Sequence, residues 1–398
     1  MAIKFVVVGA SAASMAFMTK LRSLDATCEI VCISGEPVMP YNRCFLADRL
    51  SGDTSWNDML LKPETFFKDH DITLRLGTWV TKIDAVQKMV LIGSEPICYD
   101  YLFLGIGTKP HTPSIPMQGA VDRVFTFHTA GDIATISEFI DRHKPRRMVV
   151  IGSGLNGLEA AAALHARGVK VTIIERAEQI LSSQVDTTVA AWIAQKFTEY
   201  GVTVMLNRTV VNMVKDRSNN LVLALDDTHE LLTDGVVCAT GSVLHCELLK
   251  DTGIALQQGS ILVDSAMKTN ISTIYAGGDI CMVSDMVSKQ SVKSSTWSDA
   301  MLQGLCAATQ FGKQPRSYPG AVGLRDSSWF GYDFYACGMT IGHDENYQIL
   351  SNITEQTVKR LYVRDGLLKG FVLLGDISCV GQYKQWYMTQ LPIDDKIY

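Results

Sequence analysis

The chain contains two apolar runs that are each followed directly by a glycine turn. The run from Phe5 to Val8 leads into Gly9, and the run from Met148 to Ile151 leads into Gly152. Continuous apolar runs of this kind are typical of strands that are buried on both faces of a parallel sheet. After each turn the sequence continues with a helical segment and a further apolar strand. This pattern predicts an α/β fold with two Rossmann-like domains.

A different pattern begins near Ser317, where short apolar and polar runs alternate as in strands of a half-buried sheet. The segment Arg-Asp-Gly at 364–366 lies between two such runs and predicts a hairpin turn. We expect three aromatic residues of this region to pack in the core rather than to line a cofactor site or a partner surface: Trp329, Phe334 and Tyr335.

Composition narrows the class of protein. The chain has 398 residues, of which 47% are apolar and 19% charged, so it is expected to fold throughout into two or three domains. The net charge of -5 predicts no basic surface for nucleic acid or anionic membranes, so small molecules or proteins are the expected partners. We interpret the first residues as a strand and not as a signal peptide, and no apolar run reaches the roughly 20 residues of a membrane helix.

Ten cysteines and eight histidines are scattered along the chain. Neither a CxxC pair nor an HExxH pattern occurs, so we expect no metal site and no disulfide framework. The simplest interpretation is a set of reduced thiols in the cytoplasm, most of them packed as small buried hydrophobes.

The first glycine turn departs from the usual dinucleotide-binding pattern. In that pattern three glycines allow the tight turn, the close approach of a pyrophosphate and the packing of helix on strand. The corresponding residues here are Gly9, Ser11 and Ser14. The turn therefore suits either a dinucleotide or an ordinary strand-turn-helix unit.

The second turn has the full set of Gly152, Gly154 and Gly157. Glu175 ends the next strand, near the roughly 20-residue offset at which a carboxylate binds the adenine ribose hydroxyls. The alternative is a simple glycine turn with a surface glutamate. Because a carboxylate repels a 2′-phosphate, we expect NADH rather than NADPH, although the neighbouring Arg176 could help to bind a phosphate.

Three further segments resemble those of one flavoprotein family. YDYLFLGIGTKP, which ends at Pro110, and DGVVCATGSVLHCELLKDTGIAL, residues 234–256, resemble the interdomain crossings of the pyridine nucleotide-disulfide oxidoreductase family. STIYAGGDI, residues 272–280, is similar to that family's second FAD motif. The resemblance covers nearly the whole chain and implies an FAD-dependent NAD(P)H oxidoreductase. It also implies four parts in this order: FAD domain, first part (1–113), NAD(H) domain (114–237), FAD domain, second part (238–316), and a small C-terminal α/β domain (317–398).

The segment GEPVMPYNRCFLADRL, residues 35–50, resembles a segment of rubredoxin reductases and of the flavoprotein half of nitrite reductase large subunits. In the family the aspartate that matches Asp279 binds the ribityl chain, and Ser34 or Glu36 stands where an acidic ribose ligand is usual. Glu159 matches a glutamate near the nicotinamide and the flavin, and its alternative role is to face the positive end of its helix. The remaining cofactor contacts that the resemblance implies are Gly9, Ser11, Ala13, Arg43, Gly107, Gly241 and Gly278.

Cys44 is either a redox thiol or a packing residue. The rubredoxin-reductase-like pattern has a proline and, a few residues later, a lysine where this chain has Cys44 and Asp48. The related NADH oxidases, NADH peroxidases and coenzyme A disulfide reductases place one redox cysteine in about this segment. Such a thiolate needs a nearby cation or helix N-terminus, which Arg43 and the helical segment 45–50 would supply, whereas Asp48 would oppose it.

Three functions remain open at this point. In the first, electrons pass from NADH through FAD to a small redox protein such as rubredoxin or a ferredoxin. In the second, Cys44 serves as the redox thiol in the reduction of a disulfide, persulfide, peroxide or dioxygen. In the third, the chain is a flavin-binding regulatory protein without turnover. No siroheme-binding or cluster-binding segment is recognised, so nitrite reduction is not expected, and a homodimer is compatible with each function.

Overall fold

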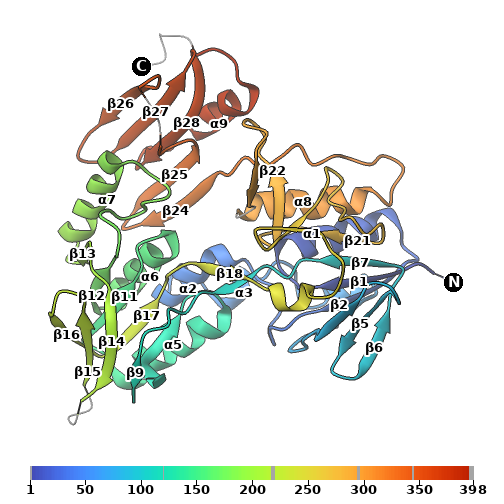
Figure 1. Ribbon diagram of the computed structural model, residues 1–398, viewed down its shortest axis with the longest axis horizontal. Coiled ribbons are helices and arrows are strands. Elements are labelled where there is room, and N and C mark those ends of the chain that lie inside the picture. The colour runs from blue at the N-terminus through green and yellow to red at the C-terminus, as the bar shows by residue number, and fades with distance from the viewer. Residues whose placement is uncertain (1, 120, 217–219, 294–295, 343–344, 394–398) are drawn as a thin grey trace. The chain divides into compact units, whose positions relative to one another are not determined.

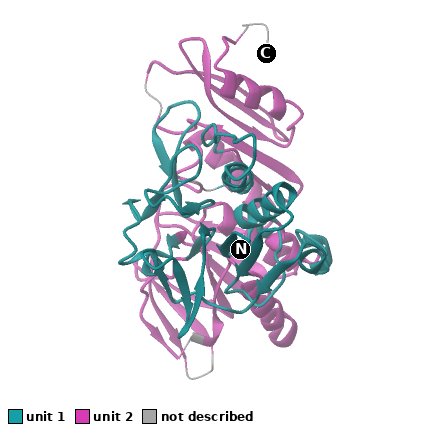
Figure 2. Ribbon diagram, turned by 90° about the vertical axis from the view of Figure 1, so that its right-hand side faces the viewer, with its two compact units in different colours: residues 1–44, 56–109, 243–323 teal, residues 45–55, 110–242, 324–398 magenta. Residues whose placement is uncertain are grey.

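The computed structural model describes residues 2–119, 121–216, 220–293, 296–342 and 345–393. The chain forms two compact units (Figure 2). Unit 1 comprises residues 1–44, 56–109 and 243–323, and unit 2 comprises residues 45–55, 110–242 and 324–398. Residues 45–55 are a short first segment of unit 2. The chain enters unit 2 again within β8 (Thr108–Pro110), returns to unit 1 within β18 (Ser242–Leu244) and ends in unit 2 from Leu324 onward. The predicted division into four domains stays a prediction.

The centre of unit 1 is a five-stranded parallel sheet (Figure 1). Its order is β21 (Ile274–Ala276), β7 (Tyr101–Leu104), β1 (Lys4–Val8), β2 (Glu29–Ile33) and β3 (Ile72–Arg75). Val6 and Val7 in β1 are fully buried, as expected for a central strand that is covered on both faces. Helices α1 (Ala12–Leu24) and α8 (Trp297–Thr309) pack against each other so closely that a Cβ atom at Gly304 would lie 2.0 Å from the carbonyl oxygen of Ala13.

Smaller elements complete unit 1. One antiparallel sheet contains β4 (Lys82–Asp84), β5 (Met89–Ile92) and β6 (Glu95–Cys98). Another contains β19 (Leu256–Gln257), β20 (Ser260–Leu262), β22 (Cys281–Ser284) and β23 (Ser291–Lys293). The short helices are α3 (Trp56–Met59), α4 (Phe66–Asp69) and η3 (Cys246–Leu249).

Unit 2 repeats the parallel design. Its first sheet has the order β10 (Val124–Thr126), β17 (Gly235–Cys238), β11 (Arg147–Ile151), β12 (Lys170–Ile174) and β13 (Thr203–Met205). A second sheet contains β16 (Glu230–Thr233), β15 (Leu221–Leu225), β14 (Val210–Lys215) and β9 (Met117–Gln118). The helices are α2 (Leu46–Ser51), η2 (Val121–Arg123), α5 (Ala130–His143), α6 (Leu155–Ala166) and α7 (Thr187–Glu199). The two parallel sheets with their helices confirm the predicted α/β class with two Rossmann-like domains.

The C-terminal part of unit 2 is an antiparallel sheet with one helix, α9 (Val380–Thr389). Asp365 and Gly366 connect two of its strands with φ angles of 55° and 70°, which is the geometry of a type I′ turn and confirms the predicted hairpin. Trp329 and Phe334 are buried as predicted, whereas Tyr335 is half-buried. The strand order is β24 (Arg325–Trp329), β25 (Tyr332–Gly338), β28 (Leu367–Leu374), β27 (Val358–Arg364) and β26 (Gln348–Ile353).

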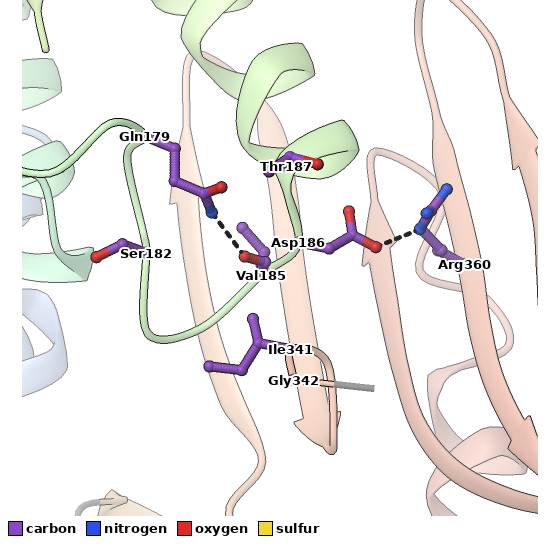
Figure 3. A pocket seen from close by; sticks show the side chains of 8 residues that line it. All are labelled: Gln179, Ser182, Val185, Asp186, Thr187, Ile341, Gly342 and Arg360. Carbon is purple, nitrogen blue, oxygen red and sulfur yellow. Dashed lines mark hydrogen bonds and ion pairs between the residues drawn. The ribbon is translucent and has the colours of Figure 1, made fainter. Parts of the chain in front are cut away.

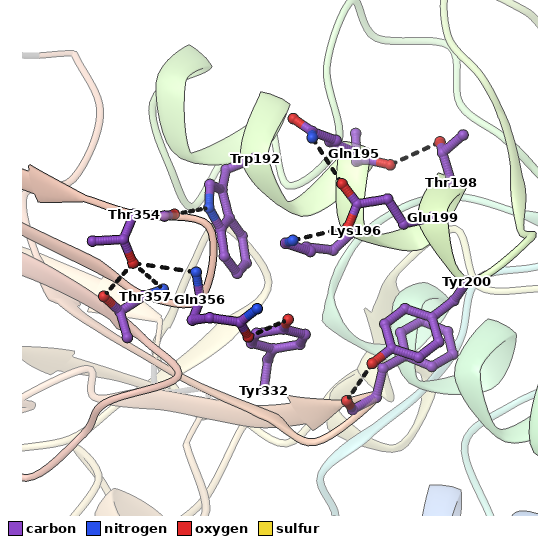
Figure 4. A network of polar contacts seen from close by, with 12 residues as sticks. Trp192, Gln195, Lys196, Thr198, Glu199, Tyr200, Tyr332, Thr354, Gln356 and Thr357 are labelled. Carbon is purple, nitrogen blue, oxygen red and sulfur yellow. Dashed lines mark hydrogen bonds and ion pairs between the residues drawn. The ribbon is translucent and has the colours of Figure 1, made fainter.

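Helix α7 and the C-terminal sheet share a network of polar and aromatic contacts within unit 2 (Figure 4). The indole Nε1 of Trp192 donates a 2.9 Å hydrogen bond to the carbonyl oxygen of Thr354. The Lys196 ammonium lies 5.3 Å from the ring centroid of Trp192 and 5.8 Å from that of Tyr332. These contacts connect the C-terminal sheet to helix α7 of the same unit. Among the described helices, none combines the length and the apolar character needed to cross a lipid bilayer.

Candidate functional site

The two glycine turns have the same geometry, one in each unit. Gly9 follows β1 with a φ of 95°, and a Cβ atom there would lie 2.1 Å from the carbonyl oxygen of Gly105. Gly152 follows β11 with a φ of 102°, and a Cβ atom there would lie 2.4 Å from the carbonyl oxygen of Ala239. Both positions therefore require glycine, because of the backbone angle and because of the neighbouring strand end. The first turn is thus built like the second, although its sequence looks weaker.

The third position of the motif explains that difference. In unit 2 a Cβ atom at Gly157 would lie 2.1 Å from the carbonyl oxygen of Gly152, so helix α6 can approach the turn only because residue 157 lacks a side chain. In unit 1 the matching residue is Ser14, and the missing side chain is that of Gly105, whose Cβ would lie 2.1 Å from the Ser14 Oγ. The position that must lack a side chain is therefore in helix α6 in unit 2, but directly after β7 in unit 1.

Both turns leave room and hydrogen-bond donors for a pyrophosphate. No protein atom of the described chain lies within 4 Å of a Cβ atom built on Gly154, Gly107 or Gly241. The N-cap residues of helices α1 and α6 are Ser11 and Gly154, and neither helix has a side-chain cap hydrogen bond. The first amide groups of a helix without such a cap are available to an anion. The residues present therefore fit a dinucleotide in each unit.

Asp279 lies beside the first turn in unit 1. Gly278 precedes it with a φ of 87° and donates its amide hydrogen to the Gln303 Oε1 at 2.7 Å. Burial raises the pKa of Asp279 to about 6, and the charge of Arg43 acts in the opposite direction. Among the described residues none donates a hydrogen bond to this carboxylate. A half-buried acceptor without a protein donor suits the hydroxyl groups of a polyol chain.

Glu36 and Arg43, both predicted FAD contacts, bind each other. The Arg43 guanidinium forms an ion pair with the Glu36 carboxylate, and the Tyr41 hydroxyl donates to the second Glu36 oxygen at 2.8 Å. Ser34 is buried, and its backbone amide donates a 2.8 Å hydrogen bond to the carbonyl oxygen of Arg75. The structure therefore brings the predicted ribose ligands to the carboxyl end of β2, with Glu36 already paired.

Cys44 is exposed and lies in the short helix η1 (Arg43–Phe45). Its backbone amide donates a 3.0 Å hydrogen bond to the Asn42 Oδ1. Most of the other cysteines are buried, as predicted: Cys28, Cys32, Cys238, Cys281, Cys306 and Cys337. Cys44 thus differs from this group in being open to small molecules. The predicted cation beside it, Arg43, is engaged with Glu36.

Glu175 ends β12 and faces the glycine turn of unit 2. Its Oε2 accepts hydrogen bonds from the Ser153 amide at 2.8 Å and the Ser153 hydroxyl at 2.7 Å. Its Oε1 accepts from the Ala177 amide at 2.9 Å. Three donors hold the carboxylate in one orientation, so its negative charge has a fixed place next to Gly154.

Glu159 occupies the second turn of α6, on the face that meets α2 and β24 within unit 2. The Ser327 hydroxyl donates a 2.7 Å hydrogen bond to its Oε1. The pKa of Glu159 is raised to about 7, chiefly by burial; the Ser327 hydrogen bond opposes this shift, and the nearby carboxylates of Asp48 and Asp326 contribute to it. Sequence reasoning missed Ser327 and Asp326, because no local pattern links residues so far apart along the chain.

A cavity of about 310 Å³ lies in unit 2 between the segment after Glu175 and the C-terminal sheet (Figure 3). Asp186 and Arg360 form an ion pair at 2.6 Å on its wall. None of the predicted site residues lines this cavity, and no sequence motif pointed to it. Its lining residues are Gln179, Ser182, Val185, Asp186, Thr187, Ile341, Gly342 and Arg360.

A family model described as pyridine nucleotide-disulphide oxidoreductase matches residues 3–304. The chain belongs to this family, which confirms the resemblance found in the sequence. Members of the family bind FAD and NAD(P)H, and the chain is an NAD(P)H-dependent flavoprotein oxidoreductase. Enzymatic activity of this class contradicts the third open function, a regulatory protein without turnover.

Individual relatives represent both remaining functions. The chain is 28% identical over 323 residues to the NADH oxidase of Methanocaldococcus jannaschii, covering 79% of this chain and 71% of the relative. It is 29% identical over 350 residues to the rhodocoxin reductase of Rhodococcus erythropolis, covering 85% and 79%. The solved water-forming NADH oxidase of Lactobacillus brevis has the same fold, with a TM-score of 0.90 at 21% identity, covering 99% of this chain and 92% of that one.

Proposed function

We propose that the protein passes electrons from NADH through FAD to a small redox protein such as rubredoxin or a ferredoxin. The observation that favours a protein acceptor over a thiol route is the ion pair between Arg43 and Glu36. A nearby cation is one of the two features that would stabilise a thiolate at Cys44, and the Glu36 carboxylate compensates the charge of the candidate cation, Arg43. The similarity to rhodocoxin reductase supports a protein acceptor. The ten free cysteines suit a reducing compartment, and we place the protein in the cytoplasm.

In unit 1 the proposed FAD contacts have separate tasks. The backbone at Gly9, Ser11 and Ala13 binds the pyrophosphate at the start of α1. Asp279 accepts the hydroxyl protons of the ribityl chain, and Gly278 gives it the necessary close approach. Ser34 or Glu36 binds the adenine ribose, and Arg43 and Gly107 complete the set. FAD, when bound, supplies the redox chemistry, while the chain supplies position and electrostatics.

In unit 2 the backbone at Gly152, Gly154 and Gly157 binds the NADH pyrophosphate, with Gly241 on the opposite strand end. Glu175 accepts the adenine ribose hydroxyls. Because three donors fix its charge, it disfavours the 2′-phosphate of NADPH. Glu159 serves the nicotinamide end. Replacing Glu175 by alanine is therefore expected to raise the KM for NADH about tenfold with little change in that for NADPH, and an unchanged KM for NADH would contradict the assignment.

The exposure of Cys44 favours a second candidate function. An accessible thiol can attack a disulfide or persulfide or be oxidised by a peroxide, whereas a buried one cannot. The similarity to an NADH oxidase adds dioxygen to the candidate acceptors. In this version Cys44 is the redox thiol that relays electrons to the acceptor.

An anaerobic titration of the purified protein with NADH separates the two functions. For a protein acceptor we expect one hydride equivalent to reduce the flavin, no long-wavelength thiolate-to-flavin band, and the same result for Cys44→Ser. Turnover with added rubredoxin or ferredoxin should then survive the substitution. A second equivalent and a band, both lost in Cys44→Ser, would instead establish the thiol route.

A further inference from the structure

Trp79 is 63% exposed and follows β3 in unit 1. The segment before it runs beside the segment after β2, where the Thr78 amide donates to the Ser34 carbonyl oxygen at 2.8 Å. The Gly77 amide donates to the Glu36 carbonyl oxygen at 3.0 Å. In a doubly wound sheet the residues that follow the second strand of the cradle face the adenosine half of the dinucleotide. Trp79 therefore lies at the adenosine end of the unit 1 cradle.

The indole ring of Trp79 lies directly on the backbone of Gly35. A Cβ atom at Gly35 would be 2.6 Å from both the Cε2 and the Cζ2 of the ring, so any side chain at 35 would displace the tryptophan. The His245 imidazole lies near the indole, with the ring centroids 6.4 Å apart and the planes tilted by 49°. Burial, followed by the charge of Lys109, lowers the pKa of His245 below its ordinary value. The protein thus holds the indole in place on one side and leaves much of its surface open.

Trp79 is more exposed than the other exposed aromatic side chains among the described residues, Phe45 at 39% and Tyr200 at 42%. Aromatic side chains bind nucleobases by stacking, since each base presents a flat π-face. The cofactor assigned to this cradle carries an adenine at the end where Trp79 lies. Ser34 and Glu36, which flank Gly35, are the proposed ligands of the adjoining ribose.

We propose that Trp79 stacks on the adenine of FAD and slows the release of the cofactor. Trp79 is then a positioning residue, because it touches the adenine and not the redox-active ring. The inference rests on the assignment of FAD to unit 1, but it does not depend on which acceptor receives the electrons.

The test compares holoenzymes of wild type, Trp79→Ala and Trp79→Phe. Release of FAD in a mild denaturant is followed by the rise of flavin fluorescence. We expect release from Trp79→Ala to be about tenfold faster, and release from Trp79→Phe to stay within about threefold of wild type because phenylalanine still stacks. Trp192→Ala in unit 2 is the matched control and should release FAD at the wild-type rate.

Tryptophan fluorescence gives a second measurement that a purely structural role would not change. A flavin nucleotide stacked on Trp79 quenches its emission, so wild type should gain emission on FAD release and Trp79→Phe should gain measurably less. Wild-type release rates in Trp79→Ala, or equal gains of emission in wild type and Trp79→Phe, would overturn the proposal while leaving NADH-dependent turnover intact. Wild-type protein purified without any flavin would overturn the cofactor assignment and this inference together.

Discussion

The Ser327 hydroxyl donates a 2.7 Å hydrogen bond to the Glu159 carboxylate, joining strand β24 to helix α6. Burial and the carboxylates of Asp48 and Asp326 make the charged form of Glu159 unfavourable, and the Ser327 bond recovers part of the loss. With a pKa of about 7, this group changes its protonation at neutral pH. A carboxyl group that titrates near pH 7 is of the kind that can hold or lose a proton at neutral pH.

Glu159→Gln should change how stability depends on pH. The pKa of Glu159 is raised from 4.5 to about 7 in the folded chain, so the unfolded state loses this proton at lower pH than the folded state. As the pH rises from about 5 to about 7, the free energy of unfolding of wild type should therefore fall, and that of the glutamine variant should fall less. Urea unfolding at several pH values measures the difference. Glu178→Gln, on an exposed residue of the same unit, is the control and should follow wild type.

Substitutions around Glu159 should move its pKa in opposite directions. Asp48→Lys replaces a nearby negative charge by a positive one and should lower the pKa, by about one pH unit, with Asp48→Asn giving a smaller decrease. Ser327→Ala removes the hydrogen bond that favours the charged form and should raise it. The pH profile of flavin reduction by NADH reports these shifts if Glu159 acts at the nicotinamide end. A profile that is identical in all three variants would remove Glu159 from the reaction.

The second cradle could be predicted from the sequence because its determinants are local. Gly152, Gly154, Gly157 and Glu175 lie within one strand-turn-helix-strand unit, so their spacing alone specifies the turn. The hairpin at Asp365 and Gly366 was predictable for the same reason.

The first cradle was ambiguous because its determinants are distant. The glycine that allows helix α1 to pack on the turn is Gly105, far along the chain from Gly9 and next to it only after β7 pairs with β1. Ser327 and Asp326 are likewise brought to Glu159 by the packing of β24 on α6. A single sequence contains no periodicity that reports such contacts, so the environment of Glu159 became visible only in the structure.

Two alanine substitutions in the second cradle should have opposite consequences. At Gly154 a Cβ atom meets no protein atom within 4 Å and φ is -68°, so Gly154→Ala should change stability by at most about 1 kcal/mol. The added methyl group projects toward the proposed pyrophosphate site, so the KM for NADH should rise about tenfold. At Gly152 the φ of 102° and the contact with Ala239 predict a loss of about 2 kcal/mol or more for Gly152→Ala. Steady-state kinetics and urea unfolding on both variants separate binding from folding. An unchanged KM for NADH in Gly154→Ala would contradict the assignment of Gly154 to the cofactor, and equal losses of stability at the two positions would contradict the difference in backbone geometry.

Breaking the ion pair of Asp186 and Arg360 should destabilise unit 2 strongly, because both side chains are largely buried. The side chains of Asp186 and Arg360 are 9% and 13% exposed (Figure 3). Asp186 also accepts hydrogen bonds from the Tyr362 hydroxyl at 2.7 Å and the Val189 amide at 3.1 Å. Arg360→Ala leaves a buried carboxylate without its cation and should lower the free energy of unfolding by about 3 kcal/mol. The double variant Asp186→Asn with Arg360→Met should recover part of this loss, since no unpaired charge remains.

An exposed ion pair of the same unit provides the control for that measurement. Arg142 and Glu138 are 68% and 64% exposed, so Arg142→Ala should change the free energy of unfolding by less than about 1 kcal/mol. Urea unfolding of the four proteins under one set of conditions gives the comparison. If Arg360→Ala behaved like Arg142→Ala, water or another cation would have to reach Asp186 in solution. In that case the cavity beside the pair, and not the pair itself, would set the local stability of this part of unit 2.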